Sequence, residues 1–177
     1  MTQGLARELA RVPFGQEFGF RRYRVPVRNK VVNVAAAGAG VGFGTVVLAG
    51  LPQGYLLYAG GVAQLGFSTA DTDVVAAFEG QFSIGTTPDA DGTLATTEID
   101  LIAATDITAA SRVVPGTIGH HANSSGASSL QLIDNSAGTA ELNLNVTIDA
   151  ADITDAEDAD LTVNGYVDLV FCIVGDD

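Results

Sequence analysis

In the carboxy-terminal half of the chain, some runs alternate apolar and polar positions with the period of a β-strand. The clearest run spans residues 141–149, where every second position is apolar, as in a strand buried on one face. Its apolar positions are Leu142, Leu144, Val146 and Ile148, and the polar ones are Asn143, Asn145, Thr147 and Asp149. Residues 163–174 are apolar on both parities near their end, which predicts a central strand or one covered by a neighbouring chain.

Short apolar runs recur from Val31 onward, separated by turn segments rich in glycine, asparagine, aspartate and serine. Helical periodicity over ten or more residues is absent from this part of the sequence. The number and spacing of the runs predict an all-β protein, built as an antiparallel β-sandwich.

Residues 31–51 are mostly apolar and lie in a stretch, residues 31–70, without a charged side chain. Its length suits a membrane helix, but glycine recurs there at every second position, at Gly38, Gly40, Gly42 and Gly44. Each glycine costs a helix about 1 kcal/mol relative to alanine, and a period of two is that of a strand. The pattern predicts no membrane partner, and a strand whose bare face lets another backbone approach closely.

The basic residues are concentrated at the start of the chain. Residues 31–177 hold one basic residue, Arg112, against 19 acidic ones. The other seven basic residues are Arg7, Arg11, Arg21, Arg22, Arg24, Arg28 and Lys30. Because a charged terminal block is often an interaction segment, we divide the chain into a basic N-terminal arm, residues 1–30, and an acidic β-sandwich body, residues 31–177. This division predicts that the body folds without the arm.

The first part of the arm has apolar residues at helical spacing before Pro13, which predicts a short amphipathic helix over residues 4–12. A helix of this length does not persist alone, so it forms only by docking on the body, on a sister subunit or on a partner. Its apolar side chains are Leu5, Leu9 and Val12, and its flanking cations are Arg7 and Arg11.

Residues 21–30 predict an extended segment with two unlike faces. Pro26 excludes this segment from a central strand because proline cannot donate a ladder hydrogen bond. One parity holds Arg22, Arg24, Arg28 and Lys30, and the other holds Tyr23, Val25 and Val27. The arm therefore offers a row of cations beside an apolar row that can lie against a surface.

Nucleic acid is the first partner that a basic arm suggests, because arginine pairs with phosphate. The acidic body repels a polyanion, and Tyr23 alone among the cations is a poor stacking platform. We therefore expect no nucleic-acid partner, but a protein with an acidic rim or the acidic body of a sister subunit. The predicted partner-binding residues are the seven cations of the arm with Leu5, Leu9 and Val12.

Candidate chemistry is sparse. His120 and His121 are the only histidines, and adjacent residues of an extended chain point to opposite sides, so they predict no metal site. Two acidic loops could bind calcium, one around Asp89 and Asp91 and one over residues 149–160. Neither has the spacing of an EF-hand, so we expect both to be solvated loops. A serine nucleophile elbow does not occur. We expect no enzyme activity, no cofactor, no metal and no small-molecule substrate.

The single cysteine, Cys172, follows Leu169, Val170 and Phe171 and precedes Ile173. Apolar neighbours on both sides predict a buried small hydrophobe rather than a reactive thiol. One cysteine also excludes a disulfide within the chain.

Residues 74–105 and 161–174 share a texture of strands and turns rich in alanine, glycine, threonine and aspartate. On these residues the chain resembles the capsid decoration, or cement, proteins of tailed bacteriophages, over roughly residues 60–177. The resemblance implies a jelly-roll-like body, a homotrimer, and an arm that grips the major capsid protein on the outer face of an icosahedral head. It implies a structural virion protein, made in the host cytoplasm, that stabilises the assembled capsid.

Three other function classes remain open from the residues. The first is a phage head-fibre or receptor-binding module anchored by the arm, with the loops as its binding surface. The second is a calcium-dependent adhesin or surface-layer domain, which predicts a melting temperature raised by calcium. The third is a small enzyme, which predicts a concave site with converging polar groups.

Overall fold

The computed structural model describes residues 19–35, 42–75, 77–108, 117–120, 131–153 and 158–175. These residues are almost entirely in strands, and none of their helices is long and apolar enough to cross a membrane. The strands are β1 (Arg21–Val34), β2 (Gly42–Gly50), β3 (Gly54–Ser68), β4 (Gly80–Gly85), β5 (Ile102–Ile107), β6 (Thr117–His120), β7 (Gln131–Asn135), β8 (Glu141–Ile148) and β9 (Ala159–Gly175). Two short 3-10 helices, η1 (Thr96–Glu98) and η2 (Ala150–Asp152), lie between β4 and β5 and between β8 and β9.

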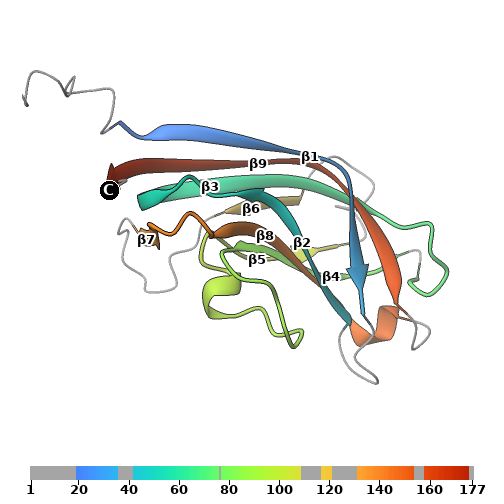
Figure 1. The fold of residues 1–177 in the computed structure, drawn as a ribbon. Helices are drawn as coiled ribbons and strands as arrows, with labels where there is room; N and C mark the ends of the chain where they lie inside the picture. The colour runs from blue at the N-terminus through green and yellow to red at the C-terminus, as the bar shows by residue number, and fades with distance from the viewer. Residues whose placement is uncertain are drawn as a thin grey trace, which may run out of the picture.

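The strands form two antiparallel sheets that face each other (Figure 1). Sheet A has the order β1-β9-β3-β6, with β7 also paired to β3, and sheet B has the order β2-β8-β4-β5. From β1 to β4 the chain alternates between the sheets, and β8 and β9 return between strands already in place. This is the strand order of a jelly roll. The predicted all-β sandwich is confirmed.

The core lies between the two sheets and is built from the inward faces of their strands, as far as the burial of the side chains is described. The four apolar positions of β8 are completely buried, as their alternation predicts. Across the core, the rings of Phe67 in β3 and Phe82 in β4 pack with centroids 5.5 Å apart. Strand β9 lies between β1 and β3, which confirms a central strand at residues 163–174.

The outer face of β8 is buried as well, which its alternation alone does not predict. Asn145 Nδ2 donates hydrogen bonds to the carbonyl oxygens of Thr87 and Glu98, at 3.1 and 3.0 Å. Its Oδ1 accepts from Thr45 Oγ1 at 2.7 Å and from the Asp89 amide at 3.0 Å. The segment between β4 and β5 thus covers this face of sheet B and satisfies polar groups that water would otherwise solvate.

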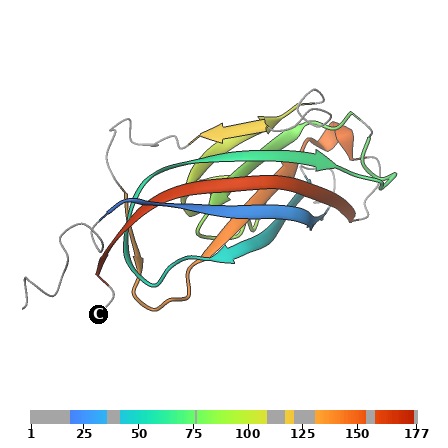
Figure 2. The ribbon, with the colours of Figure 1, turned by 90° about the horizontal axis from the view of Figure 1, so that it is seen from above.

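Residues 21–30, assigned to the arm by their charge, form most of strand β1. Their pairing with β9 runs from Arg21 opposite Phe171 to Lys30 opposite Val163, and β1 continues to Val34. The division at Lys30 therefore falls inside a strand of sheet A. β1 is the edge strand of this sheet, where Pro26 is tolerated (Figure 2).

A β-bulge divides the cations of β1 between two faces. The register shifts between Val27 and Lys30, and Asn29 adopts a left-handed backbone with a φ of 46°. The extra residue changes the parity, so Lys30 leaves the face of the arginines and its Nζ donates to the carbonyl oxygen of Val47, at 3.2 Å. The prediction that Lys30 shares a face with Arg22, Arg24 and Arg28 is wrong.

Strands β1 and β2 come close where the glycines bare one face of β2. A methyl group at Gly44 would lie 2.0 Å from the carbonyl oxygen of Asn33 in β1. The predicted close approach of another backbone is therefore confirmed at Gly44, whereas Gly38 and Gly40 lie outside the described residues. At Gly42 and Gly44 the bare face is filled by the same chain, so these two positions give no reason for a second subunit.

Candidate functional site

The predicted partner-binding residues fall into two groups in the structure. Arg21, Arg22, Arg24, Arg28 and Lys30 lie on β1, at the edge of sheet A. The others lie outside the described residues; they are Leu5, Arg7, Leu9, Arg11 and Val12. The described part of the predicted site therefore lies on β1, with Arg22 and Arg24 on the outer face of sheet A, which is turned away from sheet B.

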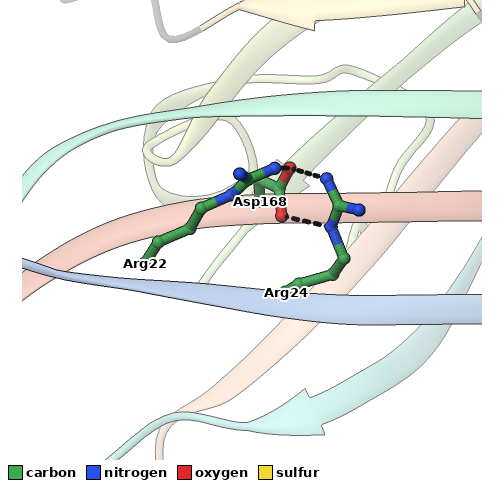
Figure 3. A network of polar contacts seen from close by, with 3 residues as sticks. All are labelled: Arg22, Arg24 and Asp168. Atoms are coloured by element: carbon green, nitrogen blue, oxygen red, sulfur yellow. Dashed lines mark hydrogen bonds and ion pairs between the residues drawn. The ribbon is translucent and has the colours of Figure 1, made fainter.

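Two of the β1 arginines converge on one carboxylate of the neighbouring strand (Figure 3). Arg24 holds Asp168 of β9 through two hydrogen bonds, Nε to Oδ1 at 2.8 Å and Nη2 to Oδ2 at 2.7 Å. Arg22 Nη2 donates to the same Oδ2. Asp168 is only 8% exposed, whereas the arginine side chains are 60% and 51% exposed. The pairing therefore covers a buried carboxylate and leaves both guanidinium groups open to solvent.

The two arginines set the ionisation of Asp168. The hydrogen bond from Arg24 holds the pKa of the Asp168 carboxyl well below its usual range, and Arg22 adds to this, while burial acts in the opposite direction. In return, the bond to Asp168 raises the pKa of Arg24. The guanidinium of Arg24 also lies over the ring of Tyr166, 4.1 Å from its centroid, a cation–π contact that adds to its attachment on β9.

Asp168 was not among the residues predicted for this site. Its signal in the sequence is the one acidic residue of the mostly apolar stretch 166–174, at the parity that faces away from the core. A lone charge at such a position needs a partner when it is buried. The partners are 144 and 146 residues away in the chain, so only the register of β1 on β9 identifies them.

We expect Asp168→Asn to lower the free energy of unfolding by about 1–3 kcal/mol near neutral pH, with the low end favoured by the exposed arginines. Because the pKa of Asp168 is depressed in the folded state, its contribution is present above the unfolded pKa of about 3.9 and fades as the pH falls through the folded value. Urea unfolding of the parent protein and the variant at pH 7 and pH 3 measures the loss of stability and its dependence on pH. Glu141→Gln, at an exposed carboxylate of β8, is the control. An equal difference at the two pH values would contradict the pairing.

Exposed apolar side chains gather on the outer face of sheet A. Leu57 of β3 lies opposite Leu132 of β7 on one side and opposite Cys172 of β9 on the other. Leu132 is 60% exposed and Val174 is 40% exposed. We call this surface the apolar patch; it consists of exposed Tyr55, Leu132 and Val174, half-buried Leu57 and Val170, and buried Cys172. Cys172 is a free and buried thiol, as predicted.

The acidic loop around Asp89 and Asp91 is solvated at Asp91, as its composition predicts, but not at Asp89. Asp89 is 8% exposed, and its Oδ1 accepts the amides of Asp91 and Gly92, at 3.0 and 2.9 Å. Its Oδ2 is buried and has no hydrogen-bond partner in the described part of the chain. The described residues contain no group of three or more histidine, cysteine, aspartate or glutamate side chains placed to hold a metal ion. His120 lies in β6, and His121 lies outside the described residues.

A hollow of about 380 Å³ opens on sheet B beside this loop. Its polar lining comes from three segments, the start of β4, the end of β5 and the end of β8, and includes Glu79, Gln81, Asp106, Thr147 and Asp149. Asp106 Oδ1 accepts a hydrogen bond from Gln81 Nε2 at 2.9 Å, so these two side chains hold each other across β4 and β5. The hollow adds negative charge to the face of the molecule opposite to the arginines of β1.

No protein-family model matches the chain, and no curated protein sequence matches it. Among solved structures, the chain is similar to one from the cryo-EM structure of Mud crab tombus-like virus. The two are 14% identical, with a TM-score of 0.39, over 94% of this chain and 97% of the other. A likeness at this level bears on neither the function nor the partners of this chain, which follow from its own surface.

Proposed function

We propose that this chain is a structural protein of a virion that binds the outside of an assembled capsid and stabilises it. The major capsid protein would be its partner, and a homotrimer is the expected form. The sequence resemblance to capsid decoration proteins suggests this role. The observation that carries it is the row of arginines along the edge of a sheet on a body that is otherwise strongly acidic.

The row is suited to a protein surface with an acidic rim. Arg28 is exposed on β1, and Arg22 and Arg24 keep half or more of their side-chain surface in solvent although both bind Asp168. An arginine held in place by one carboxylate loses less freedom when it meets a second. The acidic remainder of the chain disfavours a nucleic acid and directs the edge of β1 toward its partner.

Charged side chains on an edge strand have a second physical effect. Together with Pro26 they keep an exposed edge from pairing with other sheets, which protects a soluble protein from aggregation. This effect needs the cations but no partner. Binding of a partner and protection of the sheet edge predict different effects when one arginine is replaced by a neutral residue. Only partner binding depends on the charge of one particular arginine at a given salt concentration.

A protein that binds only the assembled lattice stabilises it by mass action, because it lowers the free energy of that state alone. Each contact with the capsid can be weak, because a trimer makes three contacts and their connection in one particle raises the overall affinity. Electrostatic contacts at a rim mainly raise the association rate and decline with salt.

The test is binding of the purified protein to empty, expanded capsids of the virus that encodes it, measured by co-sedimentation at several salt concentrations. Because Arg28 is exposed on the arginine face of β1, we expect Arg28→Gln to weaken binding about two- to fivefold and to reduce the salt dependence. Lys30→Gln is the matched control, since this side chain faces β2 and should leave binding unchanged. Absence of binding by the parent protein, or equal loss in both variants, would count against the proposal.

A further inference from the structure

The apolar patch lies beside the point where strand β1 begins. The first residue of β1, Arg21, is opposite Phe171, and the next residues of β9 toward its end carry Cys172 and Val174. Strand β3 starts at this same end of the sheet and pairs there with β7 (Figures 1 and 2). The chain that precedes β1 therefore joins the sheet next to the patch.

We propose that residues 4–12 of the same chain pack on the apolar patch as an amphipathic helix in the free protein. This goes beyond the virion role, because it concerns the protein before it meets a capsid. Leu5, Leu9 and Val12 supply an apolar stripe that needs a surface, since a helix of nine residues is not stable alone. The patch supplies one, because contiguous exposed apolar residues mark a contact surface.

The length of the intervening chain allows this contact. Residues 13–20 are eight residues, which reach at most about 26 Å when extended at roughly 3.3 Å each. From β1 across β9 and β3 to β7 there are three strand spacings of about 4.8 Å, or roughly 14 Å. The helix can therefore reach even the far side of the patch at Leu132 without exchange between chains.

The same tether favours the chain's own segment over that of a second copy. Attachment through a short stretch of chain gives a local concentration in the millimolar range, which exceeds the micromolar concentration of other copies in solution. An apolar contact too weak to hold two copies together can therefore hold a segment of the same chain.

The test uses the thiol reactivity of the full-length chain with Leu132→Cys in a Cys172→Ser background. With residues 4–12 unchanged, we expect the thiol to react about tenfold more slowly than when Leu5→Gln, Leu9→Gln and Val12→Gln are added. Tenfold protection corresponds to a docking free energy of about 1.4 kcal/mol. Leu5→Met, Leu9→Met and Val12→Ile should keep the protection, because they preserve the apolar stripe.

A thiol at Val47, exposed on sheet B, is the matched control and should react at the same rate in all these chains. Equal rates at position 132 with and without the glutamine changes would overturn the proposal. Protection that disappears on dilution from about 100 to 1 µM would also overturn it, because the occupant would then be a second copy. No capsid takes part, so a negative result here leaves the virion proposal to its own test.

Discussion

Deletion of residues 1–30 is expected to destabilise the protein severely, whereas deletion of residues 1–18 leaves the sandwich folded. The longer deletion removes most of β1, including buried Val27 and the partly buried Tyr23 and Val25 that pack on the core. Three such side chains contribute roughly 4–8 kcal/mol, against a total stability of about 5–15 kcal/mol for a domain. It also takes away both ion-pair partners of Asp168.

Thermal unfolding followed by circular dichroism compares the two truncated chains. At about 2–4 °C for each kcal/mol, the chain without residues 1–30 should melt at least about 10 °C below the chain without residues 1–18, or fail to fold. Melting temperatures within a few degrees of each other would show that β1 is a detachable arm, as the charge pattern alone predicts.

Substitution of Gly44 by alanine is expected to cost about 3 kcal/mol or more. The added methyl group would lie 2.0 Å from the carbonyl oxygen of Asn33 and 2.9 Å from its carbonyl carbon, so backbone rather than a flexible side chain must move. Because β1 packs on β2 at this point, relief of the clash separates the edges of the two sheets. Urea unfolding measures the loss.

Gly50→Ala is the matched control for Gly44→Ala. Gly50 lies on the same strand, and a methyl group there has no neighbour within 4 Å. We expect a change within about 0.5 kcal/mol, as for most exposed positions. Similar losses at the two positions would mean that the cost comes from glycine in a strand and not from the contact between β1 and β2.

Features that depend on one strand at a time could be predicted from the sequence. The alternation of residues 141–149 identified the buried face of β8, and Pro26 identified an edge strand. The glycines at every second position predicted a close backbone approach, found at Gly44. In each case the residues that carry the signal are also the residues that make the contact.

Features that depend on a distant partner could not be predicted. The bulge at Asn29 moves Lys30 to the other face of β1, although in the sequence Lys30 has the same parity as the arginines. Asp168 joins Arg22 and Arg24 only because β1 pairs with β9 in one particular register. Likewise, Asn145 is buried because a loop from elsewhere in the chain folds over it. The charge and periodicity of a segment indicate its own faces, but they do not show which distant residues pack against them.

The central claim is that this chain lies on the outside of a viral capsid and contacts it through the edge of β1. Cryo-electron microscopy of particles purified from cells infected with the encoding virus tests it most directly. We predict density for the sandwich on the outer surface of the shell, with the arginines of β1 facing acidic residues of the major capsid protein. Particles that lack this chain, or that hold it inside the shell, would contradict the account.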